Sequence, residues 1–311
     1  AVKSGTTSID KNIFEGYVED KILDNLSVHY NERYNRKKFD QNKIVNLLDI
    51  YGDEEKIYPN SKSNEILDYI GKNKFFSFII SEKYGGKNLS VAEQSSILTK
   101  IASTNPALGV TVMVPNSLGP GELLLHYGTE KQKQKYLPGL ANGDYIPCFG
   151  LTGPHNGSDA TGSIDTGTVV YDKDKGNCIE LNINKRYITL APVSNLIGLA
   201  FKLEDPYDLL DKGKTGVTVA LIESNTPGLE KLTHHNPLNA GFPNGTLKGK
   251  IKIPMENIIG GEVNCGNGWK MLMECLSAGR AVSLPATANA SSKVASYGIY
   301  NYINVRTLSK F

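Results

Sequence analysis

The stretch Cys148-Phe149-Gly150-Leu151-Thr152-Gly153-Pro154-His155-Asn156-Gly157-Ser158-Asp159 decides the fold, because an apolar lead-in gives way here to a Gly-rich loop. Its glycines, proline and Asn-Gly pair supply positive φ angles and tight turns, so the backbone can bend sharply and present N–H groups outward. Thr152 and Ser158 add hydroxyls, and Asp159 can brace the loop by bonding its backbone. A short strand running into such a turn could hold a flat polar ring and a phosphate. An ordinary hairpin-type loop would show the same spacing.

The composition describes an ordinary globular protein. The chain has 311 residues, of which 40% are hydrophobic and 21% charged, and its formal net charge of +2 gives no reason to expect nucleic acid. The four cysteines are dispersed and form no CxxC pair, so we interpret them as reduced thiols. We expect no metal site. No apolar run approaches a membrane span, and no signal peptide opens the chain. The expected location is the cytoplasm, with association at the inner membrane left open.

Helical signals extend from about Ser61 to Leu140. A capping box begins at Ser90, and a second at Thr129 opens a helix that we expect Pro138 to stop. Between them lies a mostly apolar stretch, 108–125, interrupted by Pro-Asn-Ser. It predicts an apolar helix pair suited to lining a cleft, although plain core fits the same pattern.

The hydrophobic period changes between Ile146 and Ile259. Short β-branched or alternating runs, separated by Gly, Asp and Asn, predict strands at 166–171, 178–183, 215–222 and 247–253. Because no helices of 10 to 15 residues intervene, we expect antiparallel pairing in a barrel or sandwich. Helical signals return at 268–279 and again from Arg280 onward.

The fold class is therefore α+β: an α-helical bundle, a β module and the start of a second helical bundle. We expect an N-terminal arm over 1–55 that is polar and irregular and carries the basic run Arg33–Lys38, which reads as a solvated helix face. A helical domain over 56–145, a β domain over 146–260 and a helical segment over 261–311 follow. No dinucleotide or mononucleotide Gly-rich motif is present, so a cofactor would lie between the β module and the helices.

Several stretches together resemble the acyl-CoA dehydrogenase family, and most closely its long bacterial members of fatty-acid β-oxidation. Their order and spacing match the family from about Phe75 to the C-terminus. They are Gly128–Lys133, Tyr136–Pro138, Leu151–Pro154, Gly157–Asp159, Lys185–Thr189, Ile253–Asn257, Gly266–Trp269, Pro115–Gly121, Asn184–Pro192 and Cys275–Arg280.

The resemblance implies FAD, bound in an extended form between the β domain and C-terminal helices. By position, backbone groups of Phe149 and Leu151, with Thr152, would bond the pyrimidine edge. Gly157 and Ser158 would contact the pyrophosphate, with Ser158 also beside the CoA thioester arm. Tyr187, Ile188 and Thr189 would flank the ring, the Thr189 hydroxyl lying near N5. As simpler alternatives, Tyr187 could be a strand-end core aromatic and Thr189 an ordinary strand residue.

The implied reaction is α,β-desaturation of a long- or medium-chain fatty acyl-CoA, with electrons passed to an electron-accepting flavoprotein. Thr111, Val114 and Leu118 correspond to positions lining the acyl cavity in relatives, and Arg280 is carried across as a substrate residue. Family members form homodimers or tetramers. An acyl-CoA oxidase that uses O₂ and a catalytically silent acyl-CoA-binding scaffold are the competing functions.

Three departures from the family pattern matter. Gly153 replaces a usual acid, Tyr187 replaces a usual Trp, and Gly279 stands where some relatives carry a catalytic Glu. We therefore expect no catalytic base in this chain, with the base lying beyond Phe311, and we expect the 311-residue chain alone to bind FAD poorly and to be inactive. His155 lies where it could help bind anions, and His234 and His235 read as surface residues.

Overall fold

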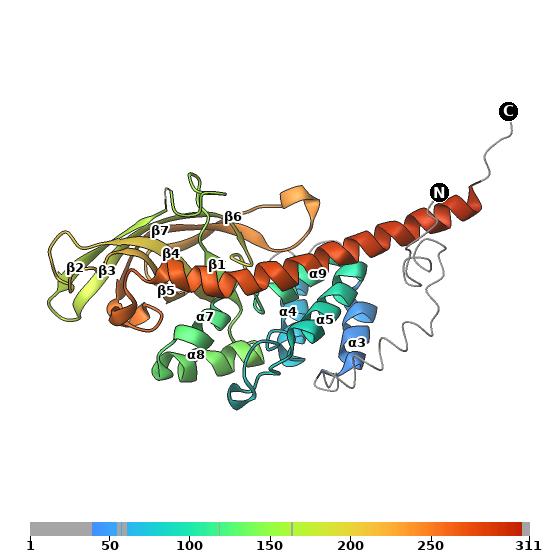
Figure 1. The fold of residues 1–311 in the computed structure, drawn as a ribbon, viewed down its shortest axis with the longest axis horizontal. Coiled ribbons are helices and arrows are strands. Elements are labelled where there is room, and N and C mark those ends of the chain that lie inside the picture. Colours follow the sequence, from blue (N-terminus) through green and yellow to red (C-terminus); the bar gives the residue numbers. More distant parts are fainter. Residues whose placement is uncertain (1–38, 55–56, 58–60, 118, 163, 307–311) are drawn as a thin grey trace, which may run out of the picture.

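The computed structural model describes residues 39–54, 57, 61–117, 119–162 and 164–306. A group of helices precedes a seven-stranded sheet, and one long helix ends the described chain (Figure 1). The predicted α+β class is confirmed. The first helices are α3 (Gln41–Tyr51), α4 (Ser61–Lys72), α5 (Val91–Thr104), α6 (Pro106–Met113), α7 (Pro120–Tyr127) and α8 (Glu130–Asn142).

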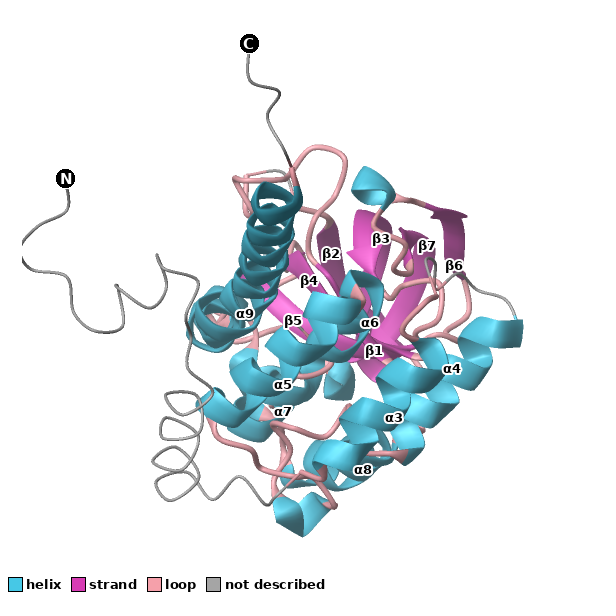
Figure 2. Ribbon diagram, turned by 90° about the vertical axis from the view of Figure 1, so that its right-hand side faces the viewer, coloured by secondary structure: helices cyan, strands magenta, loops and turns pink. Residues whose placement is uncertain are grey.

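The helices α3 to α8 gather on one side of the molecule and the sheet lies on the other (Figure 2). Both predicted capping boxes are confirmed, since Ser90 accepts from the N–H of Glu93 and Thr129 from that of Gln132. The prediction that Pro138 ends its helix is wrong, because α8 continues to Asn142. The buried side chains on both sides of the proline offset the lost hydrogen bond.

The expected irregular arm is also partly wrong. Residues 41–51 form the regular helix α3, with Asp40 as its N-cap, and the side chains of Ile44 and Leu47 are fully buried. The basic run Arg33–Lys38 lies outside the described residues.

The sheet contains β1 (Pro147–Gly150), β2 (Thr166–Asp172), β3 (Gly176–Thr189), β4 (Leu196–Glu204), β5 (Gly216–Glu223), β6 (Leu229–His234) and β7 (Asn244–Pro254). Its order is β1-β4-β2-β3-β7-β6, with β5 on the other edge of β4. The expectation of purely antiparallel pairing is wrong, because β1 and β2 both pair with β4 in parallel. The β2–β3 hairpin and the turn after β3 reverse the chain twice, so β4 runs in the direction of β2 without a crossover helix.

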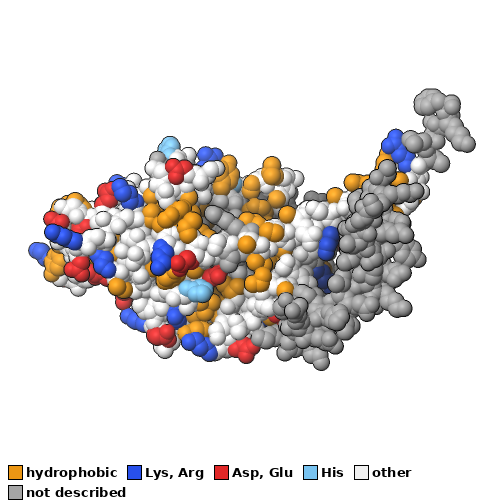
Figure 3. All heavy atoms as spheres, viewed as in Figure 1, with side chains coloured by type: hydrophobic (Ala, Val, Ile, Leu, Met, Phe, Trp, Pro, Cys, Tyr) orange, Lys and Arg blue, Asp and Glu red, His pale blue; other side chains and the backbone are white. Residues whose placement is uncertain are grey.

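One helix, α9 (Gly268–Val305), replaces the two helices expected after residue 268. It contains Pro285 and packs along α5, where the Thr99 hydroxyl donates to the Ala286 carbonyl at 3.2 Å. On the face in Figure 3, hydrophobic side chains gather along this helix. No helix of the described ranges is both long and apolar enough to cross a membrane.

Candidate functional site

The loop that follows β1 is braced from within. Asn156 is 3% exposed, and its side-chain amide donates to the carbonyls of Leu151 at 3.0 Å and Ala160 at 3.2 Å. The Asp159 carboxylate accepts from the Gly162 N–H at 3.1 Å, so the predicted brace by Asp159 is confirmed. Sequence reasoning missed the larger part played by Asn156. Its place in an Asn-Gly pair suggested only a turn.

The loop lies directly beside the end of β3. The Arg186 N–H donates to the Thr152 carbonyl at 3.0 Å, and the Lys185 ammonium donates to the Leu151 carbonyl at 3.1 Å. A Cβ on Gly153 would lie 2.7 Å from the Asn156 side-chain oxygen and 2.9 Å from the Asn184 carbonyl. This close approach explains why glycine, rather than an acid, occupies position 153.

Lys185 is fully buried beneath this junction. Its ammonium lies 3.2 Å from Asp165, whose carboxylate also accepts from the Asn184 N–H at 3.0 Å. Burial lowers the pKa of Lys185 below its ordinary value, and the Asp165 charge opposes that change. Sequence reasoning missed this burial, although the alternation along β3 places Lys185 on the same face as the buried Leu181 and Ile183.

Tyr187 stands at a β-bulge between Lys185 and Ile188, with a φ of 58° that non-glycine residues rarely adopt. The residue is 49% exposed, its ring is tilted by 36° against that of His235 at 4.6 Å between centroids, and the Arg186 guanidinium lies 4.9 Å from its centre. The alternative that Tyr187 is a core aromatic is therefore wrong. The bulge presents a flat aromatic surface outside the core.

Thr189 lies two residues further along the strand and pairs with Asn244 on β7. The Asn244 amide donates to the Thr189 hydroxyl at 3.4 Å, which leaves the hydroxyl hydrogen for another acceptor. Ile188 between them is buried. In the described structure the Asn244 side-chain oxygen is buried and accepts no hydrogen bond.

The comparisons with known proteins agree with this architecture. A family model described as the acyl-CoA dehydrogenase N-terminal domain matches residues 33–144. An acyl-CoA dehydrogenase of Bacillus subtilis is 32% identical over 218 residues, which are 70% of this chain and 54% of the relative. The chain therefore carries the N-terminal domain of the acyl-CoA dehydrogenase family, and it is similar to that family over the residues matched. It spans about half the length of this curated relative.

Two solved acyl-CoA dehydrogenase structures share the fold. Butyryl-CoA dehydrogenase from Megasphaera elsdenii is 23% identical, with a TM-score of 0.70 over 87% of this chain and 70% of that chain. An acyl-CoA dehydrogenase complexed with FAD from Bacillus anthracis is 24% identical, with a TM-score of 0.73 over 86% of this chain and 44% of that chain. The predicted resemblance is thus confirmed at the level of family and fold.

The positions expected to line an acyl cavity lie deep in the helical part. Thr111 is fully buried and its hydroxyl donates to the Ala107 carbonyl at 2.7 Å, while Val114 is 3% exposed. Both residues are buried like ordinary core residues, so their expected role in lining an acyl cavity stays a prediction. Leu118 lies outside the described residues, and the side chain of Arg280 is not described.

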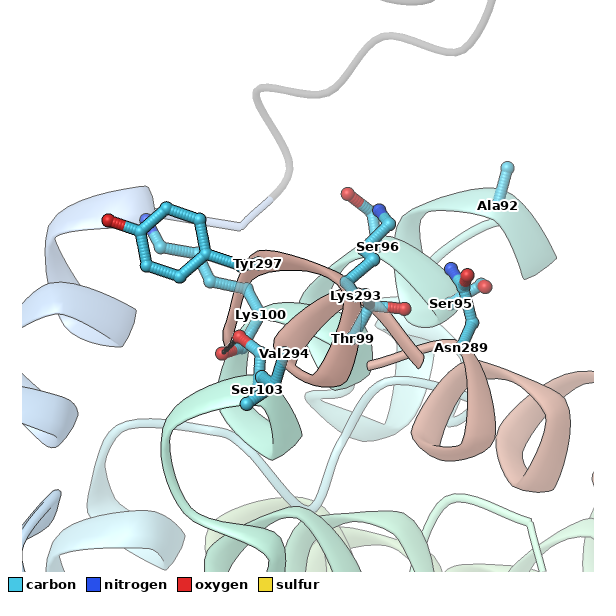
Figure 4. A pocket seen from close by; sticks show the side chains of 10 residues that line it. All are labelled: Ala92, Ser95, Ser96, Thr99, Lys100, Ser103, Asn289, Lys293, Val294 and Tyr297. Carbon is cyan, nitrogen blue, oxygen red and sulfur yellow. Dashed lines mark hydrogen bonds between the residues drawn. The ribbon is translucent and has the colours of Figure 1, made fainter. Parts of the chain in front are cut away.

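A groove lies elsewhere, between α5 and α9 (Figure 4). It has a volume of about 890 Å³, and small hydroxyl-bearing side chains of α5 face Asn289, Lys293 and Tyr297 of α9 across it. None of the predicted flavin or substrate residues lines it. Gly157 and Ser158 are exposed residues of the loop after β1 instead.

The expectation that His234 and His235 are surface residues is wrong, since both are half-buried, whereas His155 is exposed. His235 lies 2.9 Å from the Thr246 hydroxyl in addition to lying against the Tyr187 ring. Desolvation, and then the charge of His235, lowers the pKa of His234 below 6.5. Desolvation, and then the charge of Arg186, lowers the pKa of His235 as well.

These pKa shifts predict a pH-dependent stability. The unfolded histidines bind protons more readily than the folded ones, so the free energy of unfolding falls as the pH drops through about 6.5 and levels off below the folded pKa values. Melting temperatures between about pH 7.5 and 5.5 test this. A His234→Gln/His235→Gln variant should show a flatter curve over that range. An equal slope in the variant and the natural chain would contradict the prediction.

Proposed function

We propose that this chain is part of an FAD-dependent enzyme that desaturates a saturated acyl-CoA between its α and β carbons. The observation that carries the proposal is the contact of Leu151 and Thr152 with Lys185 and Arg186, which directly precede the 187–189 strand end. The two segments that the family resemblance assigns to one flavin begin beside this contact, although 28 residues separate Ser158 from Tyr187 in the sequence.

The residues present fit a flat, polar redox ring. The half-exposed Tyr187 offers a stacking surface, and the Thr189 hydroxyl has a hydrogen left to donate. The buried and unpaired Asn244 oxygen beside it offers an acceptor. A Cβ on Gly157 would meet no atom within 4 Å, so a bulky phosphate can approach the backbone there.

FAD, when bound, supplies the acceptor for the β-hydride of the substrate. Phe149 and Thr152 would hold its pyrimidine edge. Both acceptor positions of the Leu151 carbonyl are already used by Lys185 and Asn156, so the contact assigned to Leu151 would come from its N–H. Donors at this edge and near Thr189 would favour negative charge on the bound ring.

The residues assigned to the substrate are also proposals. Ser158 would lie near the thioester arm, with Arg280, Thr111, Val114 and Leu118 toward the rest of the substrate. We assign no base within the chain, because position 279 is glycine. A fatty acyl-CoA substrate used in β-oxidation, an electron-accepting flavoprotein as redox partner and a homo-oligomeric assembly are proposed from the family resemblance.

The test measures FAD binding and the reduction of bound flavin by substrate in the full-length protein. Thr189→Ala and Ser158→Ala are each expected to weaken FAD binding by about tenfold or to slow flavin reduction by a similar factor, because each removes one hydrogen bond to the bound group. Thr226→Ala, which removes a turn hydroxyl bonded to the Glu223 carbonyl, is the control. Flavin absorbance and its bleaching by butyryl-, octanoyl- and palmitoyl-CoA provide the readouts.

Three outcomes would contradict parts of this proposal. A protein that shows no flavin absorbance under saturating FAD would be a silent acyl-CoA-binding scaffold. Hydrogen peroxide formed in step with substrate oxidation would make it an oxidase. Unchanged affinity and reduction rate in both variants would remove the site assignment and leave the family resemblance intact.

A further inference from the structure

The buried ion pair Lys185–Asp165 has no part in the proposed function so far. The Lys185 side chain is completely inaccessible and Asp165 is 15% exposed. Removing an ammonium from water is costly, and a hydrophobic pair of the same size would stabilise the fold as well or better. The position of these two charges therefore suggests a role other than stability.

The ammonium reaches the Leu151–Thr152 peptide, which lies directly after β1 at the start of the 152–158 turn. It donates at 3.1 Å to the Leu151 carbonyl, which belongs to the peptide group whose N–H is that of Thr152. A charged donor on the carbonyl oxygen polarises this peptide and strengthens its N–H as a donor. The same lysine precedes Tyr187 by two residues, so it ties the loop to the bulged strand end.

Asp165 holds the lysine in place. Its carboxylate binds the ammonium at 3.2 Å and accepts from the Asn184 N–H at 3.0 Å. The side-chain carbon Cγ of Lys185 also lies 3.3 Å from where a Cβ on Gly150 would be, so the aliphatic stem is packed under β1. The ammonium consequently has little freedom to leave the Leu151 carbonyl.

We propose that Lys185, held by Asp165, is a positioning residue that fixes the Leu151–Thr152 peptide and strengthens the Thr152 N–H as a donor to the electron-rich edge of a reduced flavin. This inference rests on the proposed FAD site. It assigns Lys185 an electrostatic effect on flavin reduction without direct contact with the substrate.

The experiment compares the full-length protein with its Lys185→Met/Asp165→Asn variant. The variant leaves no uncompensated buried charge, and the new asparagine can still accept from the Asn184 N–H, so folding should be retained. The matched control is Lys252→Met/Asp172→Asn, which removes a 2.9 Å ion pair on the exposed part of the same sheet.

Three measurements are made. Without flavin, the amide hydrogens of residues 151–162 should exchange about tenfold faster in the variant, because the loop has lost its anchor. With FAD, the Kd should rise by about tenfold. The reduction potential of the bound flavin should become more negative, because the reduced and more negative form has lost a strengthened donor. The control variant should match the natural protein in all three.

The outcomes separate this inference from the proposed function. If the natural protein binds no FAD, the proposed function fails, while the exchange measurement still reports on the anchor. If FAD binds and the potential of the variant is unchanged, the inference is overturned, because a purely structural anchor would alter affinity alone. Should the double variant fail to fold, Lys185→Gln keeps a donor without the charge and must still shift the potential.

Discussion

Replacing Asn116 with alanine is expected to lower the free energy of unfolding by about 3–5 kcal/mol. The side chain is 2% exposed and makes three hydrogen bonds to the backbone. It accepts from the Phe78 N–H at 2.8 Å and donates to the carbonyls of Phe75 at 2.6 Å and Val112 at 2.8 Å. Alanine would leave all three backbone groups buried without partners, which is more costly than the loss of the bonds themselves.

Asn301→Ala is the matched control for this substitution. Asn301 also donates to a backbone carbonyl, that of Tyr297 at 2.9 Å, but it is exposed on α9, so water replaces the lost bond. We expect a change within about 0.5 kcal/mol. Urea denaturation of both variants measures the difference, and similar midpoints would show that Asn116 does not link the turn at Phe75–Phe78 to the helical part.

A side chain at position 279 is expected to destabilise the protein although it lies inside a helix. A Cβ on Gly279 would lie 2.8 Å from the Ser117 carbonyl oxygen and 2.9 Å from its side chain. Gly279→Ala should therefore lower the free energy of unfolding by about 1–3 kcal/mol through overpacking. Gly279→Glu, which would copy the acid of some relatives, should cost more, because a carboxylate would be forced into the buried contact between α9 and Ser117.

Gly298→Ala provides the control within the same helix. A Cβ there meets no atom within 4 Å, and the residue is exposed. Alanine should therefore raise stability by about 0.5–1 kcal/mol, the usual difference from glycine in a helix interior. Opposite signs at positions 279 and 298 in thermal unfolding would confirm the close packing of α9. A stabilising Gly279→Ala would refute it.

Local sequence signals located the elements whose stability is decided within a few residues. The capping boxes at Ser90 and Thr129 were predicted correctly, because reciprocal hydrogen bonds between residues three apart need no tertiary partner. The predicted strands at 166–171 and 247–253 correspond to β2 and β7. Here alternation along the chain matches one buried and one exposed face.

The central strand β4 was missed for a physical reason. Its first six residues are all buried, so the alternation that marks a half-exposed strand is absent. Pro138 was misjudged as a helix end because burial of the surrounding side chains offsets the missing hydrogen bond. The parallel pairing of β4 with β1 and β2 was likewise invisible, since it depends on which strands meet in space.

By itself the sequence determined the α+β class, the family resemblance and the two segments proposed for flavin binding, because composition, turn residues and motif order are local properties. Only the tertiary structure showed that Leu151 and Thr152 contact the strand just before Tyr187, that Asn156 and the buried Lys185 hold the loop, and that Tyr187 is turned outward at a bulge. Those features arise from contacts between residues far apart in the chain, and the burial that gives a charge such as that of Lys185 its effect exists only after folding.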